Sequence, residues 1–221
     1  MSINIEKYKT ITAELKGKAV LVAVSKTKPI EDIQALYDLG HRDFGENYVQ
    51  ELVEKEAELP KDIRWHFIGH LQSNKVKYIA PFVHLIHGVD SFNLLKEINK
   101  QAVKNNRVID CLLQVHIAKE ETKFGFDVHE LNELHQLHEL KNIKIIGLMG
   151  MASFSDDKEL IKKEFQELKT IFEQRAQLST TNHQLTTLSM GMSSDYKIAL
   201  EEGSNMVRIG SLLFGERNYN H

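Results

Sequence analysis

The stretch AVLVAVSKTKPIEDIQALYDL, residues 19–39, joins a short apolar run to a polar turn and then to a segment with helical spacing. Residues 20–24 are apolar and rich in valine, which is typical of a strand buried in a parallel sheet. Pro29 suits the first turn of a helix, and apolar residues recur after it at helical intervals. The stretch is therefore predicted to form one βα unit.

The same alternation of strand and helix recurs along the chain, and eight units can be recognised. The predicted strands are 20–24, 41–44, 64–68, 84–88, 109–117, 143–149, 186–190 and 206–209. The predicted helices between them are 29–39, 48–59, 73–79, 92–105, 128–140, 157–177 and 196–202. This order is typical of parallel strands joined by right-handed crossovers.

Eight βα units in 221 residues suit closure into a single (β/α)8 TIM barrel, an α/β fold. An open doubly wound sheet is the alternative. Residues 5–15 form an extra helical segment before the first strand, whereas only 210–221 follow the last one. We expect the N-terminal helix to cover the gap that a missing eighth helix would leave, within one domain spanning 1–221.

Composition and charge narrow the class of protein. The chain is 42% hydrophobic and 27% charged, with a net charge of −3 and its basic residues spread among acidic ones, which argues against a nucleic-acid partner. No window has the roughly 18 consecutive apolar residues of a membrane span, and residues 1–10 lack the apolar core of a signal peptide. We therefore expect a cytoplasmic protein with no membrane partner.

A lysine follows the first predicted strand at the rim where barrels carry their working residues. Lys26 comes directly after the apolar run and Ser25. Burial disfavours the charged form of a lysine and so favours the neutral amine that attacks an aldehyde to form a Schiff base. The alternative is a lysine that snorkels to the surface, and Lys28 is expected to face solvent or the rim.

Two glycine- and serine-rich segments follow the seventh and eighth predicted strands. They are SMGMSSD, 189–195, and VRIGS, 207–211. Glycines let backbone N–H groups approach a phosphate, serine hydroxyls add donors, and barrels often bind phosphate after these two strands. Because neither GxxxxGK[ST] nor GxGxxG occurs, a small phosphorylated aldehyde fits better than a nucleotide.

Other candidate residues lie in or after the remaining strands, near their ends, and singly they carry little weight. They include Asn47, His66, Lys123 and Met149. His66 and His70 invite a metal interpretation, but no HExxH or cysteine-bearing zinc pattern accompanies them, so we expect no metal site. The single cysteine, Cys111, lies in an apolar run and is expected to be a buried hydrophobe.

Six segments together carry a resemblance to a known family. They are AVSKTKP, FGENYVQE, WHFIGHLQSNK, GLM, LSMGMSSD and MVRIGSLLFGERNY. In the same order and over nearly the whole chain, they resemble the YggS/PROSC family of pyridoxal-phosphate homeostasis proteins. The resemblance implies a fold-type III barrel similar to the N-terminal domain of alanine racemase.

The resemblance also implies which residues contact pyridoxal 5′-phosphate (PLP). Lys26 matches the lysine that holds the cofactor as a Schiff base, and Arg208 matches the partner of the pyridine nitrogen. The implied phosphate contacts are Ser193, Gly210 and Ser211. Asn47, His66 and Met149 match further pocket positions, and Lys123 matches a lysine that accepts the cofactor secondarily.

These residues favour a carrier of PLP over an enzyme. An arginine facing the pyridine nitrogen disfavours its protonation, which leaves the ring a poorer electron sink. The alanine racemase design takes its second base, a tyrosine, from a further C-terminal domain, and none of the six tyrosines here can be assigned that role. We expect a monomeric reservoir that hands PLP to apo-enzymes and has no catalytic residue of its own. An amino-acid racemase and a phosphate-sensing barrel without Schiff-base chemistry are the alternatives.

Overall fold

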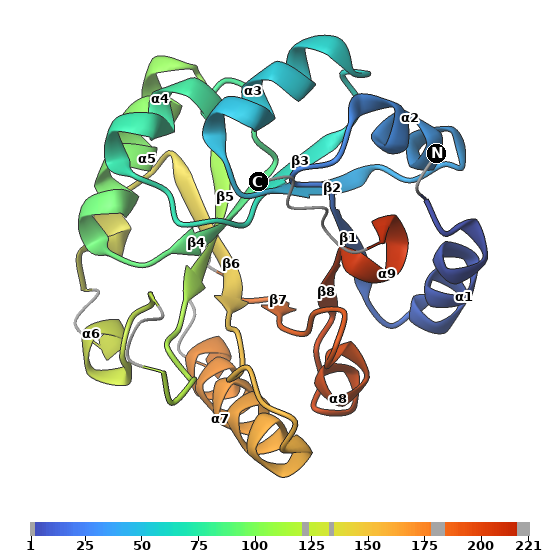
Figure 1. Cartoon of the computed structure of the whole chain (residues 1–221). Helices are drawn as coiled ribbons and strands as arrows, with labels where there is room; N and C mark the ends of the chain where they lie inside the picture. The colour runs from blue at the N-terminus through green and yellow to red at the C-terminus, as the bar shows by residue number, and fades with distance from the viewer. Residues whose placement is uncertain (1–2, 121–123, 133–134, 178–183, 216–221) are drawn as a thin grey trace.

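The computed structural model describes residues 3–120, 124–132, 135–177 and 184–215. Eight parallel strands pair in chain order and close into a barrel, as Figure 1 shows. The strands are β1 (Val20–Val24), β2 (Asp43–Glu46), β3 (Arg64–Phe67), β4 (Leu85–Val89), β5 (Ile109–Gln114), β6 (Ile143–Met149), β7 (Thr187–Ser189) and β8 (Met206–Ile209). The predicted (β/α)8 barrel is thus confirmed, and the open sheet is excluded.

Helices surround the barrel on its outside (Figure 1). They are α1 (Ile5–Leu15), α2 (Ile30–Asp38), α3 (Val49–Glu58), α4 (Val76–Ile79), α5 (Phe92–Lys104), α6 (Val128–Asn132), α7 (Lys158–Gln177), α8 (Tyr196–Glu201) and α9 (Ser211–Phe214), with the 3-10 turns Ser73–Lys75 and His135–Glu139. None of the helices within the described ranges is both long enough and apolar enough to cross a membrane.

Alternate residues of each strand face opposite sides of the barrel wall. On β1, Val22 packs inside the barrel in a small cluster of Val22, Leu85, Leu112, Met149 and Met206. Its neighbours Leu21 and Ala23 belong to the larger core between the barrel and its helices. This alternation matters for function because it decides which residues beyond each strand reach the barrel mouth.

The N-terminal helix closes the outer wall where the chain ends its last unit. β8 pairs with β1, and the short α9 that follows β8 lies beside α1 (Figure 1). The backbone N–H of Asn4 donates to the carbonyl of Leu213 at 2.7 Å, and Tyr8, Ile11 and Leu15 are buried. The expectation that this helix covers the gap after the eighth strand is confirmed.

Packing of α1 can be tested by truncating one buried side chain. Ile11 is fully buried, so Ile11→Ala leaves a cavity and is expected to lower the free energy of unfolding by about 2 to 4 kcal/mol. Ile5 on the same helix is 40% exposed, and Ile5→Ala is expected to change the free energy of unfolding by less than about 0.5 kcal/mol. Urea unfolding of both variants checks this, and equal losses would show that α1 is not docked through Ile11.

Two predicted strands differ from the observed ones by more than one residue at an end, and the strands predicted at 64–68, 84–88 and 186–190 differ by a single residue at one or both ends. β2 runs from Asp43 to Glu46 and not over 41–44, because His41 is part of the turn after α2, where its N–H bonds the carbonyl of Leu36. β5 ends at Gln114 and not at 117, because the chain beyond it pairs with Phe126. The predicted helix 128–140 is a short α6 followed by a separate 3-10 turn.

Candidate functional site

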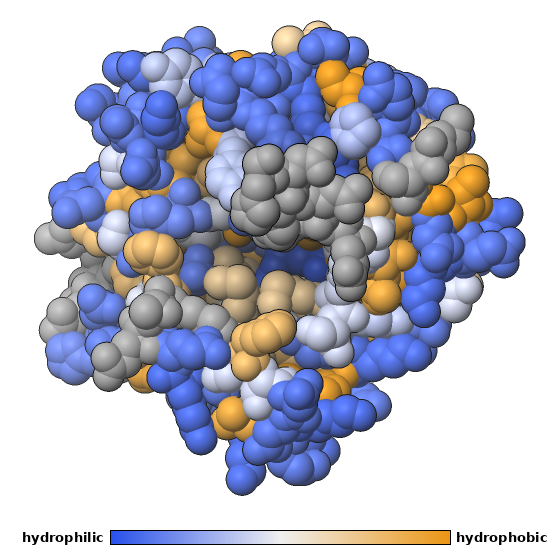
Figure 2. Space-filling model, viewed as in Figure 1, coloured by the Kyte–Doolittle hydropathy of each residue, from blue (hydrophilic) through white to orange (hydrophobic). Residues whose placement is uncertain are grey.

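A pocket of about 520 Å³ opens where the carboxyl ends of the strands meet. Figure 2 shows it as a hollow in the middle of this face, where hydrophilic and hydrophobic side chains adjoin. The lining residues are Val24, Lys26, Lys28, Asn47, Ile68, Met151, Phe154, Met192, Ser193, Ser194, Arg208, Gly210, Ser211, Leu212 and Gly215. Six of the eight predicted cofactor contacts are therefore gathered around one cavity: Lys26, Asn47, Ser193, Arg208, Gly210 and Ser211.

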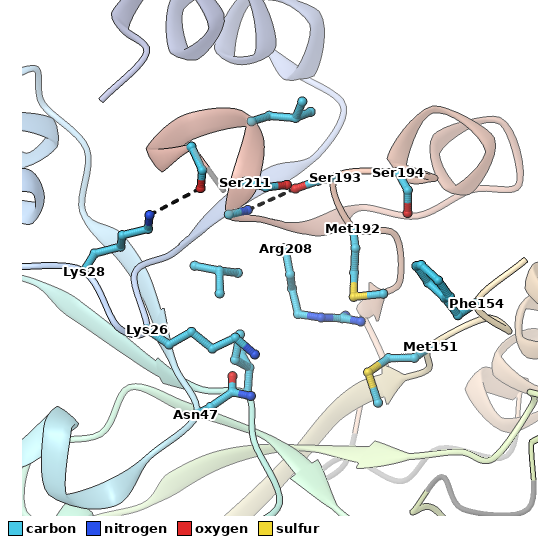
Figure 3. Close-up of a pocket in the computed structure, with 15 residues that line it drawn as sticks. Lys26, Lys28, Asn47, Met151, Phe154, Met192, Ser193, Ser194, Arg208 and Ser211 are labelled. Atoms are coloured by element: carbon cyan, nitrogen blue, oxygen red, sulfur yellow. Dashed lines mark hydrogen bonds between the residues drawn. The ribbon is translucent and has the colours of Figure 1, made fainter. Parts of the chain in front are cut away.

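Strand parity directs Lys26 into this pocket. Val22 and Val24 face inward on β1, so the next inward position after the strand is Lys26. In Figure 3 its side chain extends along the cavity beside Asn47. Thr27 then adopts a positive φ of 63°, and the backbone N–H of Lys28 donates to the carbonyl of Ser25 at 3.0 Å. This tight turn fixes the backbone directly after the lysine.

A buried polar cluster outside the barrel holds the end of β1 in place. Lys55 donates to the carbonyl of Ser25 at 2.8 Å and to the carboxylates of Glu46 and Glu51 at 2.8 and 2.6 Å. The Ser25 hydroxyl donates to Glu46 at 2.6 Å. Burial raises the pKa of Glu46 to about 7, against the opposing effect of the Lys55 ammonium. The cluster ties Ser25, the residue before Lys26, to β2 and α3.

Arg208 on β8 brings a buried positive charge to the pocket. Its Nη1 donates to the carbonyl and hydroxyl of Ser189 at 2.9 and 2.7 Å, and its Nη2 donates to the carbonyl of Gly150 at 3.0 Å. Burial lowers the pKa of Arg208 to about 10, with Asp195 acting in the opposite direction. The guanidinium is therefore charged at neutral pH and is fixed to the ends of β6 and β7.

The two glycine- and serine-rich segments meet on one side of the pocket, as predicted from their places after β7 and β8. The N–H of Gly210 donates to the Ser193 hydroxyl at 3.2 Å, and Ser211 begins α9 (Figure 3). Lys28 also lines this side, with its ammonium 2.9 Å from the carbonyl oxygen of Phe214. Ser193, Gly210 and Ser211 are named the anion-binding corner after the role predicted for them from the sequence, and their contact with a phosphate stays a prediction.

Asn47 supplies an acceptor without a partner. Its side-chain oxygen is buried and accepts no hydrogen bond from the residues that the structure describes. Gly69 lies close against the backbone of Asn47, where a side chain would collide with it. Because buried polar atoms are nearly always satisfied, an unpaired oxygen in a pocket indicates a place for a ligand donor.

Two predicted contacts lie below the pocket. Met149 belongs to the apolar cluster inside the barrel, and His66 is 1% exposed and bonds to Asp43 and His87 at 3.0 and 2.9 Å. Neither is among the lining residues. Their direct contact with a cofactor stays a prediction, and Lys123 lies outside the described residues.

Several lining residues were not anticipated. Met151, Met192 and Phe154 form an apolar side of the pocket, and Phe154 is 93% exposed. Met151 lies two residues after Met149, so strand parity gave a signal for it, whereas nothing in the sequence singled out Phe154. The histidines His66 and His70 bond separately, to Asp43 and Asp90, and no group of three metal-type ligands forms among the described residues.

Asp43 anchors the polar groups of the barrel interior and gives the fold an acid-sensitive point. Burial raises the pKa of Asp43, but hydrogen bonds from Arg64 and His66 outweigh burial and hold the pKa below its usual range. A carboxylate with a depressed pKa stabilises the fold above its unfolded pKa near 3.8, and that stabilisation is lost as the pH falls.

Asp43→Asn is therefore expected to lower the free energy of unfolding at pH 7 by about 2 kcal/mol, because the charged partner of Arg64 is removed. The difference from the parent protein should shrink below pH 4, where the Asp43 carboxylate of the unfolded parent chain starts to be protonated while that of the folded chain stays ionised. Chemical unfolding from pH 3 to pH 7 measures both. Asp62→Asn, at the exposed ion pair with Arg42, should have little effect at any pH. A difference at Asp43 that does not change with pH would contradict this reasoning.

Comparisons with known proteins agree with this geometry. The family model described as alanine racemase, N-terminal domain, matches residues 3–218. A relative named pyridoxal phosphate homeostasis protein, from Aquifex aeolicus, is 47% identical over 204 residues, which are 91% of this chain and 88% of the relative. A protein of the same name from Synechocystis is 41% identical over 95% of this chain and 97% of its own length.

A solved structure shows the same architecture. PipY of Synechococcus elongatus is 37% identical, covers 95% of this chain and 99% of its own, and has been solved without PLP, at a TM-score of 0.90, and with PLP bound, at 0.87. An alanine racemase of Clostridium difficile shares the fold at a TM-score of 0.76 and 14% identity, over 99% of this chain and 58% of the racemase.

Proposed function

The chain belongs to the alanine racemase N-terminal domain family and, within it, to the pyridoxal phosphate homeostasis proteins, and from this premise we propose that it binds PLP and acts in the homeostasis of that cofactor. The observation that carries the proposal is the gathering of a lysine amine, a buried arginine and an anion-binding corner around one pocket. PipY, 37% identical, has been solved with PLP bound.

The residues present fit each part of PLP. Lys26 would hold the aldehyde carbon as a Schiff base, and Arg208 would face the pyridine nitrogen. The anion-binding corner would take the phosphate: the Ser211 hydroxyl can donate to it, and the Ser193 hydroxyl, which accepts from the Gly210 N–H, has its own hydrogen left to donate. The unpaired oxygen of Asn47 gives a polar group of the bound molecule a partner. Contacts from His66 and Met149 would come from the barrel interior below the pocket.

When bound, PLP supplies a reactive aldehyde and a pyridine ring that draws electrons from attached groups. Arg208 works against the second of these properties. Its guanidinium is charged at neutral pH, and a second positive charge on the ring nitrogen would be repelled. The residues of this chain therefore hold the cofactor while leaving it poorly suited to stabilise a carbanion, which favours storage and delivery over turnover.

Among the residues that the structure describes, one side of the pocket is apolar and partly exposed. Phe154, almost fully exposed, stands at the edge of the cavity with Met151 and Met192 (Figure 3). An accessible Schiff base can be attacked by water or by another amine, which is what transfer to an apo-enzyme requires. We propose that the chain works in the cytoplasm as a single-domain monomer and that apo-enzymes needing PLP receive it.

Transfer and turnover give different results in one experiment. The PLP-loaded protein is mixed with an apo-enzyme whose activity reports the arrival of PLP, and in parallel with L-alanine in deuterium oxide. We expect recovery of the apo-enzyme's activity, and exchange of the alanine α-proton no faster than with free PLP. Racemisation or exchange at rates typical of enzymes would instead support the racemase alternative, which the 14% identity with an alanine racemase does not itself favour.

A further inference from the structure

A line of hydrogen bonds runs through the barrel interior beneath the pocket. Arg208 Nη1 is 2.7 Å from the Ser189 hydroxyl, which is 3.3 Å from His87 Nδ1. His87 Nε2 is 2.9 Å from His66 Nδ1, and His66 Nε2 is 3.0 Å from Asp43 Oδ1. These five side chains, the interior relay, come from β8, β7, β4, β3 and β2. All five residues are buried.

The direction of every bond in the interior relay follows when each buried polar hydrogen is given an acceptor. A guanidinium can only donate, so the Ser189 hydroxyl accepts from Arg208, and among the described residues its own hydrogen has His87 Nδ1 as its acceptor. His87 must then carry its proton on Nε2 and donate to His66 Nδ1. His66 in turn donates from Nε2 to Asp43, whose carboxylate can only accept. Each ring thus has one proton, on Nε2, and is neutral.

The surroundings of His87 agree with a neutral ring. Burial, the largest cause, lowers the pKa of His87 well below its ordinary value. Asp43 is held ionised by Arg64, which contacts it from the next strand. His84 stands edge-on to His66 with ring centroids 5.4 Å apart, and burial lowers its pKa as well. The charged groups of this region are thus the Arg208 guanidinium at one end of the interior relay, and the Asp43 carboxylate with Arg64 at the other.

We propose that Ser189, His87 and His66 are positioning residues for Arg208: they form a one-way chain of donors, anchored on Asp43, that fixes the guanidinium in the orientation it presents to the pocket. The role toward the cofactor rests on the proposed function, in which Arg208 faces the pyridine nitrogen. The chain itself is a property of these side chains and exists whether or not PLP is bound.

The geometry explains why such a device is useful at this place. Three N–H groups of Arg208 are used by the barrel wall, on Ser189 and Gly150, so the guanidinium plane cannot rotate without breaking them. The Ser189 hydroxyl accepts from Arg208 while its own hydrogen points away from the guanidinium, and the hydrogen bond to His87 Nδ1 holds that hydrogen in such a direction. The tautomer of a ring deep in the barrel therefore determines how firmly the arginine at the pocket is held.

The test is nitrogen-15 NMR of the protein purified without PLP, at pH 7. The protein has 11 histidines, so the two rings are assigned from the signals missing in His87→Gln and His66→Gln. We expect both rings to be neutral and protonated at Nε2, and the Nη signals of Arg208 to be separate because rotation is hindered. A proton on Nδ1 of His87, or an imidazolium, would overturn the proposal.

Variants separate positioning from folding. Ser189→Ala removes the hydroxyl link and should give a mixture of His87 tautomers and merged Nη signals of Arg208. Ser189→Thr keeps a hydroxyl and should restore both signatures. Ser204→Ala removes another buried hydroxyl, which among the described residues bonds to the carbonyls of Leu188, Met190 and Met206, and should leave both signatures unchanged. Unaltered Arg208 signals in a folded Ser189→Ala protein would refute the proposal.

The outcome is independent of the proposed function. If the tautomers are as expected but the protein does not react with PLP, the interior relay is supported and the proposed function fails. If PLP binds to Lys26 but the tautomers are reversed, the proposed function is supported and the interior relay fails. The two claims can therefore fail separately.

Discussion

Lys26→Ala is expected to abolish covalent capture of PLP. The parent protein mixed with PLP should show the visible absorption of a Schiff base, and borohydride should fix the mass of the reduced cofactor onto the chain. In Lys26→Ala both signals should fall to background, because the amine that lines the pocket at the end of β1 is gone. Absorption spectra and intact-mass measurements before and after borohydride provide the readout.

Lys28→Ala is the matched control for this result. Lys28 lines the same pocket two residues away, but its ammonium lies by the carbonyls of Phe214 and Gly215 at the end of α9. We expect the Schiff-base absorption to persist in Lys28→Ala, with weaker binding because one cation has been removed near the anion-binding corner. Loss of the Schiff-base absorption in Lys28→Ala together with its retention in Lys26→Ala would show that Lys28 holds the cofactor, which would contradict the assignment to Lys26.

Ser211→Asp is expected to weaken PLP binding strongly by placing a carboxylate at the anion-binding corner. Two like charges about 4 Å apart repel by roughly 4 kcal/mol at an effective dielectric constant of about 20, and screening reduces this. The affinity for PLP should therefore fall by roughly 100- to 1,000-fold. The fold should survive, because Ser211 is the first residue of α9 and acidic side chains are favourable in a first helical turn.

Pyridoxal, which lacks the phosphate, provides the internal comparison. Its affinity should be nearly the same for Ser211→Asp and the parent protein, since no second anion is present to be repelled. Ser91→Asp adds the same charge at the start of α5, where the serine already caps the helix through the N–H of Leu94, and should bind PLP normally. An equal loss for PLP and pyridoxal would mean that the phosphate is held elsewhere.

The barrel could be predicted from the sequence because each buried parallel strand is a short apolar run followed by a turn and a helix. The first and last residues of the strands were harder to predict. Residues 41–44 look like a strand by composition, yet Gly45 and Glu46 complete it. A side chain at position 45 would meet Val22 and Ile68 inside the barrel, and only the closed structure reveals that contact.

Most of the pocket could be predicted for a related reason. Closure of a parallel barrel brings the residues after every strand to one rim, so Lys26, Arg208 and Ser193 meet although they are far apart in sequence. Depth within the barrel was not predictable, and it is depth that separates His66 and Met149 from the lining residues. The partnership of His87 with Ser189 depends on how the strands are staggered, which no local pattern encodes.

The most direct measurement of the central claim is peptide mapping by mass spectrometry of the full-length parent chain after incubation with PLP and reduction by borohydride. The account predicts that one equivalent of reduced cofactor is fixed on the peptide containing Lys26, and that excess inorganic phosphate lowers the yield by competing at Ser193, Gly210 and Ser211. A label spread over surface lysines, insensitive to phosphate and absent from Lys26, would contradict it.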